Sequence, residues 1–371
     1  MNQRRFLLLP ATVVTAMVVS ACGGGDDEGS QGSATGEGTE NGVVVQMDGE
    51  SREDYLGRLY EAAKEEGTVA YYQSANDDEL QAIIEAWGTA YPDVEFEPVS
   101  ASSGTILERA LLEAESGNVK GDVYGGSAAD QDQLAQIGAL AEYDAVNEED
   151  VLEQYRLDGP YVATGYLSYH PAFNVDQITE EELPTEWEGY CEPEWKGKFA
   201  IDQEGGEWAT GILTAMGEEE GTALLECLAA NEPRLVRGST NRTELLASGE
   251  FPVMLDGYGH RLWEFEQEGS PIKTQATSPE PLTVVLDMAS VFEDAPHPNA
   301  ARLLLEFFLT EEGQQVFLDQ NKGGTLESTE APYAEYLANN ETTILGPEEA
   351  DFEAGFQAFV DIFLGGEVPA P

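Results

Sequence analysis

The sequence predicts an α/β protein built from two units, each a mostly parallel sheet flanked by helices. Short apolar strands alternate with amphipathic helices from residue 51 to 127, and the alternation resumes after about residue 160. Such βαβ alternation is typical of a parallel sheet. The chain has 371 residues, of which 41% are hydrophobic, so there is enough material for two domains with real cores.

The first unit starts with a helix that Ser51 opens, with Asp54 three residues later, and that Gly67 ends. The apolar run at residues 68–72 is of strand type, and the turn-like Gln73-Ser74-Ala75-Asn76 follows it. Further elements are expected as a helix at 77–90, a strand at 94–99, a helix that residues 102–104 cap, and a strand at 121–127 that ends in a glycine-rich loop.

The second part repeats this pattern and ends in helices. Strands are expected at 161–173, 199–202, 235–237, 252–255 and 282–291, and helices at 207–216, 221–230, 243–248 and 259–268. The last helices are expected at 299–309, 312–319, 332–339 and 348–363.

The loops that follow the strands are the candidate binding site, because ligands in open α/β sheets lie beyond the carboxyl ends of the strands. Several of these loops run directly into a helix, whose unpaired N–H groups and dipole favour an anionic group. The alternative is that their serines and threonines are ordinary N-caps. The candidate ligand-binding residues are Tyr72, Ser74, Ser102, Ser103, Gly104, Gly126, Ser127, Glu207, Trp208, Ser239, Thr240, Asn241, Tyr258 and Arg261.

The charge of the chain says more about its solvent than about its ligand. With 72 acidic and 17 basic residues, the net charge is −55. A phosphate backbone would be repelled, so we expect no nucleic-acid partner. Self-repulsion of this size is screened at high ionic strength, which favours a halophilic or brackish habitat over calcium binding or a general solubility bias.

The N-terminus is predicted to be an export signal followed by a lipid anchor. Residues 1–21 combine Arg4-Arg5 with a short apolar run, which indicates a signal peptide, exported by either the twin-arginine or the Sec route. Val19-Ser20-Ala21-Cys22 is similar to a lipobox, in which Cys22 would carry the lipid. Residues 22–50 are rich in Gly and acids and are expected to form a disordered tether.

The remaining cysteines and the histidines give little sign of catalysis or metal binding. Cys191 and Cys227 are an even pair in an oxidising compartment, so they form either a disulfide or two buried thiols. His170, His260 and His297 are the only histidines, and Gly-x-Ser-x-Gly, Cys-x-x-Cys and His-Glu-x-x-His are absent. We therefore expect no cofactor, no metal site and no enzyme.

The order of segments resembles the extracellular solute-binding proteins of ABC importers, in particular the iron(III)- and thiamine-type branch. The similarity runs from about residue 55 to 317 and rests on short segments in the same order. Among them are Leu-Tyr-Glu-Ala-Ala-Lys-Glu-Glu-Gly at 59–67, Glu-Pro-Glu-Trp-Lys-Gly-Lys at 192–198 and Ala-Pro-His-Pro-Asn-Ala-Ala at 295–301.

The resemblance implies a two-lobed periplasmic-binding fold whose lobes close on a small solute. The helix N-termini at the strand ends favour an anionic group on that solute. Lobe 1 would combine residues 51–163 with 281–371, lobe 2 would be 164–280, and crossing strands would lie near 164–169 and 280–284. The implied partners are an ABC permease and its ATPase. The implied location is outside the cytoplasm, as a monomer held at the membrane by its lipid alone.

The resemblance leaves the ligand open. Where iron(III)-binding members carry adjacent tyrosines, alignment on Arg261 places Gly257 and Tyr258 here. Tyr258 would then contact a ligand through its ring or hydroxyl, with Arg261 either nearby or in a surface ion pair. An iron-binding member with a non-standard site is one alternative. A solute receptor for a sensor kinase or chemoreceptor is another, and a secreted hydrolase is a third.

Overall fold

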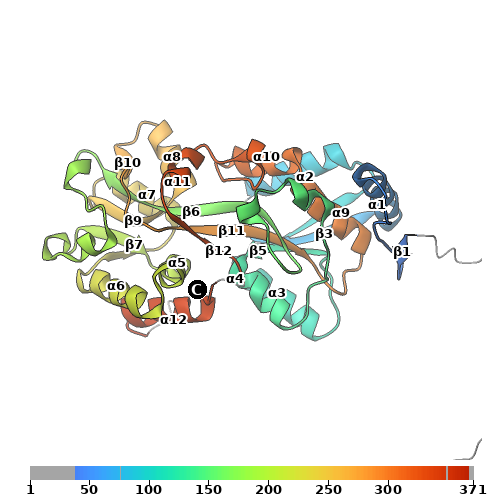
Figure 1. The fold of residues 1–371 in the computed structure, drawn as a ribbon, viewed down its shortest axis with the longest axis horizontal. Coiled ribbons are helices and arrows are strands. Elements are labelled where there is room, and N and C mark those ends of the chain that lie inside the picture. Colours follow the sequence, from blue (N-terminus) through green and yellow to red (C-terminus); the bar gives the residue numbers. More distant parts are fainter. Residues whose placement is uncertain (1–37, 76, 348–349, 367–371) are drawn as a thin grey trace, which may run out of the picture.

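The computed structural model describes residues 38–75, 77–347 and 350–366. The chain forms two α/β lobes joined through a shared sheet (Figure 1). This confirms the predicted fold class. The predicted signal peptide at 1–21, Cys22 and the start of the tether lie outside the described residues. No helix within the described part of the chain is long and apolar enough to cross a membrane.

The main sheet has ten strands, with the order β4-β3-β5-β11-β6-β9-β7-β8, while β10 pairs with β6 and β12 with β11. The strands are β3 (Thr68–Gln73), β4 (Glu95–Ser100), β5 (Val123–Ser127), β6 (Val162–Asn174), β7 (Phe199–Asp202), β8 (Arg234–Val236), β9 (Val253–Tyr258), β10 (Ile272–Thr274), β11 (Leu282–Val291) and β12 (Thr342–Leu345).

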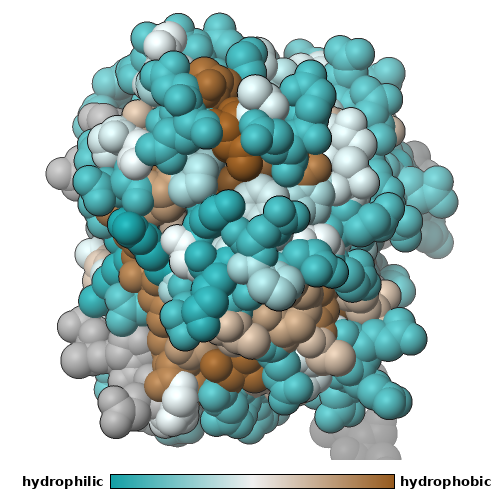
Figure 2. Space-filling view, turned by 90° about the vertical axis from the view of Figure 1, so that its left-hand side faces the viewer, coloured by the Kyte–Doolittle hydropathy of each residue, from teal (hydrophilic) through white to brown (hydrophobic). Residues whose placement is uncertain are grey.

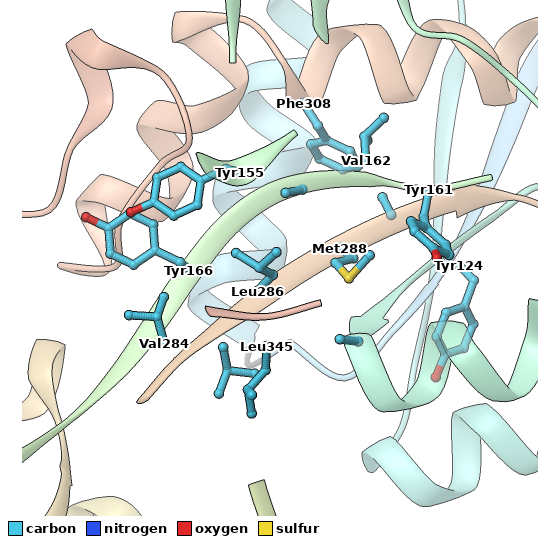
Figure 3. Packing of buried hydrophobic residues seen from close by; sticks show 14 of the residues in the cluster. Tyr124, Tyr155, Tyr161, Val162, Tyr166, Val284, Leu286, Met288, Phe308 and Leu345 are labelled. Carbon is cyan, nitrogen blue, oxygen red and sulfur yellow. The ribbon is translucent and has the colours of Figure 1, made fainter. Parts of the chain in front are cut away.

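The two longest strands, β6 and β11, connect the lobes. They run antiparallel with Val284 opposite Ser168 and Asp287 opposite Gly165. Nearly every residue of both strands is buried, as expected for strands covered on both faces. Figure 3 shows the core around them, where Tyr166 stacks on Tyr155 with ring centroids 5.0 Å apart.

Helices cover both faces of the sheet. They are α1 (Arg52–Glu66), α2 (Asp77–Ala90), α3 (Ser103–Glu115), α4 (Ala128–Gln136), α5 (Gly206–Met216), α6 (Glu218–Ala230), α7 (Ser239–Ala247), α8 (Gly259–Gln267), α9 (Pro298–Phe308), α10 (Glu311–Asp319), α11 (Ala334–Ala338) and α12 (Phe352–Phe363). The caps of α1 follow the sequence signals: Ser51 accepts a hydrogen bond from the Asp54 N–H, and Gly67 has φ of 83°.

The same strand–helix unit occurs three times in each lobe. In the first lobe, α2, α3 and α4 directly follow β3, β4 and β5, and in the second, α5, α7 and α8 follow β7, β8 and β9. β5 ends opposite Asp287 of β11, and β9 ends opposite Tyr169 of β6. The carboxyl ends of these strands therefore meet along the two crossing strands.

The region preceding α1 differs from the prediction of a disordered tether up to residue 50. Residues 38–50 are folded, with β1 (Thr39–Glu40) paired to β2 (Val43–Val44). Val44 is buried, and its N–H donates to Oδ1 of Asn299 over 2.8 Å. Arg58 also bonds the carbonyl of Val45. Side chains on α1 and α9 that bond its backbone thus order a segment whose composition alone suggests a linker.

The C-terminal helix lies with the second lobe, whereas the sequence analysis assigned all of 281–371 to the first. α12 packs mainly on α5 and α6. A Cβ on Gly355 would lie 2.0 Å from Oγ1 of Thr210, so only glycine permits this close approach. Strand β12 runs parallel to β11 and carries the chain across.

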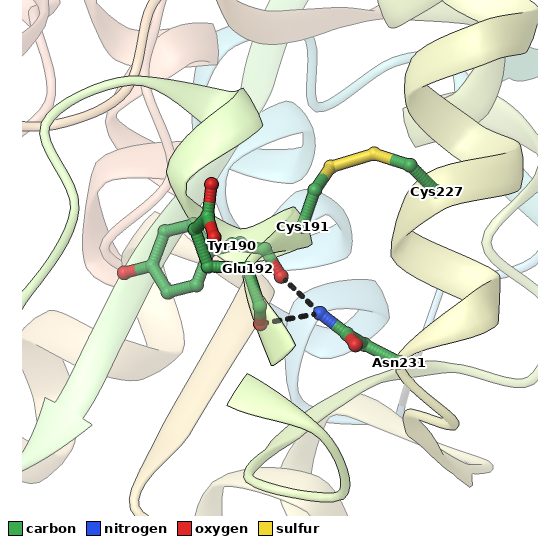
Figure 4. Close-up of a disulfide and its surroundings, with 5 residues drawn as sticks. All are labelled: Tyr190, Cys191, Glu192, Cys227 and Asn231. Carbon is green, nitrogen blue, oxygen red and sulfur yellow. Dashed lines mark hydrogen bonds between the residues drawn. A yellow bond between two sulfur atoms is a disulfide. The ribbon is translucent and has the colours of Figure 1, made fainter. Parts of the chain in front are cut away.

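A disulfide joins Cys191 to Cys227 in the second lobe, with their Cα atoms 5.4 Å apart (Figure 4). Cys191 ends a short 3-10 turn, and Cys227 lies on α6. Beside the bridge, Nδ2 of Asn231 donates to the carbonyls of Tyr190 at 2.8 Å and Glu192 at 3.0 Å. The bridge and these bonds tie the loop before β7 to α6.

The outer surface agrees with the acidic composition. Figure 2 shows the end of the second lobe, where hydrophilic residues cover most of the face and apolar residues appear in smaller patches. A large contiguous apolar surface would indicate a protein partner or a membrane-binding face. This face does not show one.

Candidate functional site: where the two lobes meet

A pair of tyrosines and a glutamate form the centre of the site. The hydroxyl of Tyr169 donates to Oε2 of Glu207 over 3.0 Å and lies 3.3 Å from the hydroxyl of Tyr258. The rings are neighbours because Tyr169 of β6 stands opposite Tyr258 of β9. Glu207 is the second residue of α5, where the helix dipole favours a carboxylate.

Two further carboxylates act on Glu207 electrostatically. The pKa of Glu207 is raised to about 7, mainly by burial; the hydrogen bond from Tyr169 opposes this rise, and the negative charges of Asp130 and Asp287 add to it. Asp130 lies on α4 in the first lobe and accepts a 3.1 Å bond from the hydroxyl of Tyr124. One carboxylate from each lobe and one from a crossing strand therefore share this region.

Lys322, in the loop after α10, supplies positive charge on the first-lobe side. Its Nζ lies 2.9 Å from Oε2 of Glu79 on α2 and 3.9 Å from Oδ2 of Asp287. Burial by itself would lower the pKa of Lys322, but the charges of Asp287 and Glu79 raise it above the usual value. The lysine is therefore charged at neutral pH.

The first turn of α8 adds a histidine and an arginine from the second lobe. The pKa of His260 is lowered to about 3, mainly by burial and also by the charges of Lys322 and Arg261, so the imidazole is neutral at pH 7. Arg261 bonds Oε2 of Glu264 over 2.6 Å. The charge of Lys322 acts on a residue of the opposite lobe, so these groups face each other across the lobes.

We call this group the interlobe site. It is defined by Gln73, Glu79, Asp130, Tyr169, Glu207, Tyr258, His260, Arg261, Asp287 and Lys322.

Several polar atoms of the interlobe site have no hydrogen-bond partner in the described part of the chain. They are Nε2 of Gln73, Nδ1 of His260, Nε of Arg261 and Oδ2 of Asp287. Gln73 is the last residue of β3, and its Oε1 accepts from the N–H of Ala75. A buried polar atom without a partner is costly, and a bound ligand is one way to satisfy it.

Beneath the second-lobe side, Arg242 of α7 holds two strand ends together. Its guanidinium forms ion pairs with Asp202, the last residue of β7, and with Asp256 of β9. Arg242 and Asp256 are completely buried. Burial and the charge of Asp202 raise the pKa of Asp256, while Arg242 opposes this rise. The triad fixes the end of β7, which leads into α5 with Glu207, and the end of β9, where Tyr258 lies.

Some of the sequence-predicted residues lie together at the faces of the lobes. Oγ of Ser74 is 3.1 Å from Oγ of Ser103, and Oγ of Ser102 is 2.8 Å from Oγ1 of Thr105. Ser127 caps α4 by accepting from the Asp130 N–H. Gly104 lies in the exposed first turn of α3, and Gly126 is half-buried beside Asp130.

Of the loop predicted at residues 238–241, only Gly238 lies outside a helix. Ser239, Thr240 and Asn241 are the first three residues of α7, so this helix begins four residues before the predicted position 243. Their backbone N–H groups are those of a first helical turn, and Nδ2 of Asn241 donates to the carbonyl of Arg237. The helix start thus stays a candidate anion site, although the residues are not a loop.

Two predicted residues belong to the cores of the lobes. Tyr72 is fully buried, and its hydroxyl donates to Glu113, ten residues into α3. Trp208 is also fully buried and packs edge-on against Trp187 with ring centroids 5.9 Å apart. These positions do not place either side chain in the interlobe site.

The sequence analysis did not select Gln73, Glu79, Asp130, Tyr169, Asp287 and Lys322. Four of them are acidic or tyrosine residues in a chain that has 72 acids and 15 tyrosines, so type alone did not single them out. Lys322 had a usable signal, because lysine is scarce here and this one follows a helix on a loop.

A cluster of His, Cys, Asp and Glu ligands and a large surface hollow are two other features that could mark a site. Within the described residues, no three His, Cys, Asp or Glu side chains are grouped so that they could hold a metal ion. A hollow of about 730 Å³ is lined by residues such as Asn147, Glu311 and Glu327 and contains no member of the interlobe site. The convergence of charge, rather than cavity size, marks the candidate site.

Comparison with known families decides what this architecture is. The sequence pattern of the family described as "Bacterial extracellular solute-binding protein" matches residues 122–341. The chain belongs to this family. The match includes both crossing strands and most of the interlobe site. The family is one of solute-binding proteins, in agreement with the expectation that this chain is not an enzyme.

Solved structures share the fold at low sequence identity. Iron-bound HitA from Pseudomonas aeruginosa is 19% identical, with a TM-score of 0.69 over 80% of this chain and 99% of that one. AfuA from Actinobacillus pleuropneumoniae, with exogenous fructose-6-phosphate bound, is 18% identical, with a TM-score of 0.65 and the same coverages. The substrate-binding protein of an ABC transporter from Agrobacterium tumefaciens is 15% identical, with a TM-score of 0.65 over 80% and 94%.

Proposed function

We propose that this extracellular solute-binding protein is the lipid-anchored capture component of an ABC importer. A small solute enters between the lobes, which close about β6 and β11, and the loaded protein delivers it to a permease driven by an ATPase. One observation carries the proposal. Glu79 and Asp130 from the first lobe, Glu207 and Arg261 from the second, and Asp287 from a crossing strand converge on one place.

The protein groups that we propose to contact the solute follow from this convergence. The interlobe site supplies the charged and hydroxyl groups. The starts of α3, α4 and α7 supply backbone N–H groups, with Ser102, Ser103, Ser127 and Ser239 at or near them. Tyr258 and Arg261 are common to the interlobe site and to the sequence-predicted set.

The lipid anchor is proposed from the sequence. Val19-Ser20-Ala21-Cys22 has the small residues and the cysteine of a lipobox, directly after an apolar run. A lipid on Cys22 would hold a monomer at the outer face of the membrane, on the tether predicted from the composition after Cys22. A receptor that presents the solute to a sensor kinase shares this architecture, and adjacent permease and ATPase genes would favour transport.

A specific observation supports iron(III) as a second candidate solute. The hydroxyls of Tyr169 and Tyr258 are 3.3 Å apart, and Glu207 lies 3.0 Å from the first of them. Hard cations prefer such oxygen ligands. However, burial raises the pKa of both tyrosines, and the charge of Glu207 raises it further. Iron would therefore have to displace tightly held protons.

A thermal-shift screen tests the proposed function. The mature chain with Cys22→Ser, in about 2 M KCl to screen its charge, would be screened with ferric citrate, thiamine, sugar phosphates, phosphonates, carboxylates and amino acids. A solute that binds only the folded state stabilises it by about 2.7 kcal/mol at a hundredfold excess over Kd. Stabilisation by at least one solute is expected. If no solute stabilised the chain in this broad screen, solute capture would be refuted.

A further inference from the structure

We infer that the interlobe site takes a small zwitterion, whose ammonium group lies among Asp130, Glu207 and Asp287 and whose anionic group faces Gln73, Arg261 and Lys322. This inference rests on the proposed function and names its solute class. The carboxylates indicate the ammonium end, and unpaired donors indicate the anionic end. The two kinds of group come from independent observations.

We call the four carboxylates of the interlobe site the acidic pole. They carry more negative charge than the cations of the site neutralise. Glu79, Asp130, Glu207 and Asp287 give four carboxylates, against two cations, Lys322 and Arg261. Lys322 pairs with Glu79 and lies 3.9 Å from Oδ2 of Asp287, and Arg261 pairs with Glu264, which lies outside the site. Asp130 accepts from the hydroxyl of Tyr124 and Glu207 from that of Tyr169, and Oδ2 of Asp287 has no hydrogen bond within the described residues. An ammonium group would supply the missing charge and donors.

We call Gln73 and Arg261 the donor pole, because each has a buried N–H donor without a hydrogen-bond acceptor in the described part of the chain. Gln73 is 6% exposed, and its Nε2 has no partner. Nε of Arg261 is also buried and unpaired. Tyr71, which shares a strand face with Gln73, has its pKa raised by burial and by the charges of Glu79 and Asp287. This places the face of β3 that carries Gln73 next to the interlobe site.

A third unpaired group completes the site between the poles. His260 is 8% exposed, its Nδ1 has no partner, and its ring lies 5.7 Å from that of Tyr258. A neutral imidazole can either donate or accept, so it suits either end of a ligand. A purely anionic solute would leave Asp130 and Glu207 uncompensated. A purely cationic one would leave the donors of Gln73 and Arg261 unpaired.

Proton exchange follows from the same geometry. In the free protein the charges of Asp130 on α4 and Asp287 on β11 act on Glu207, which also accepts from the hydroxyl of Tyr169, itself 3.3 Å from that of Tyr258; the fourth carboxylate, Glu79 on α2, is paired with Lys322. An ammonium group replaces the proton that Glu207 holds below about pH 7. Binding should therefore be roughly tenfold weaker at about pH 6 than at about pH 8 for a ligand that does not itself titrate there.

The test uses matched probe pairs that differ by one amine. These are taurine and ethanesulfonate, 4-aminobutyrate and butyrate, and 2-aminoethylphosphonate and ethylphosphonate. Calorimetric titration of the mature Cys22→Ser chain would measure each Kd at both pH values. We expect at least one amine to bind, at least tenfold more tightly than its amine-free partner. For taurine and 4-aminobutyrate, we expect the pH dependence given above.

Variants identify the residues. Glu207→Gln should weaken binding of the amine at least tenfold at about pH 8 and remove the pH dependence. The control Glu226→Gln makes the same charge change at an exposed position of α6 and should leave both unchanged. Circular dichroism of each variant separates loss of binding from loss of fold.

Three results would overturn the inference. An amine-free partner could bind as tightly as its amine, ferric citrate could be the only ligand, or none of the three amines could bind. In each case, the broad screen described above still decides the proposed function separately, because any stabilising solute supports capture.

Discussion

Replacing Glu207 by glutamine should stabilise the ligand-free protein, and more so at higher pH. The pKa of this carboxyl rises from an ordinary value of 4.5 to about 7. Below pH 4.5 the group is protonated in both the folded and the unfolded chain, so it does not affect stability. Between 4.5 and 7 only the unfolded chain releases the proton, so stability falls as pH rises. Above 7 the full cost is present.

The magnitude follows from the shift. A difference of about 2.5 pKa units corresponds to about 3.4 kcal/mol at 1.36 kcal/mol per unit. The residue as a whole is half-buried although its carboxyl group is enclosed, so we expect somewhat less because of solvent screening. Glu207→Gln should raise the free energy of unfolding by less than about 1 kcal/mol near pH 5 and by about 2–3 kcal/mol near pH 8.

Denaturant unfolding at constant KCl, followed by circular dichroism, measures this difference. Glu226→Gln is the matched control, because it removes the same charge from an exposed helix position. Glutamine Oε1 still accepts from Tyr169, so the hydrogen bond itself is retained. An equal effect of Glu207→Gln at both pH values would refute the reasoning, because the gain would then not come from the ionised carboxylate.

Three further predictions concern the buried ion pairs of Arg242, the salt dependence of stability and the lipid anchor. Arg242→Met leaves the buried Asp202 and Asp256 without their counter-ion and should lower the free energy of unfolding, measured with denaturant, by about 3–5 kcal/mol. Adding Asp256→Asn should recover part of this loss. If it recovered nothing, the ion-pair explanation would be contradicted. Raising KCl from about 0.1 to 2 M should raise the unfolding midpoint, because the chain carries a charge of −55, and an unchanged midpoint would argue against salt adaptation. Cys22→Ser should abolish incorporation of a labelled fatty acid and release the protein from membranes; an unlabelled wild-type chain would exclude the lipid anchor.

The order of strands and helices could be predicted because local signals set it. The caps at Ser51 and Gly67, and the apolar runs that became β3 and β5, lie within a few residues of the elements they define. The helix start near Ser103 was predicted for the same reason, whereas α4, which Ser127 caps, was not predicted. A parallel sheet then brings those ends to one edge.

Other features depend on contacts between distant residues. Tyr71 and Tyr72 look alike in sequence, and only the packing of α3 on one face of β3 shows that Tyr72 bonds Glu113. Lys322 meets Glu79 across 243 positions of the chain, so no local pattern links them. The polar run at Ser239 favours a loop by composition, yet α7 begins there.

The lobe boundary was misplaced for a similar reason. A family outline with two crossings assigns everything after the second crossing to the first lobe. In this chain, β12 runs beside β11 and α12 packs on α5 of the second lobe, so there is a further crossing. The short segment at 38–50 was also misjudged, because its order depends on Asn299 and Arg58 rather than on its own composition.

The central claim is that the two lobes close on a solute, and a distance measurement tests it most directly. Exposed Glu108 on α3 and Glu244 on α7 lie on helices that begin at the faces of opposite lobes. Dyes on Glu108→Cys and Glu244→Cys, in the Cys22→Ser background, report their separation by energy transfer. If the lobes close, energy transfer between the two dyes rises and saturates as the solute that stabilises the chain in the screen is added. Unchanged transfer with that solute bound would contradict it.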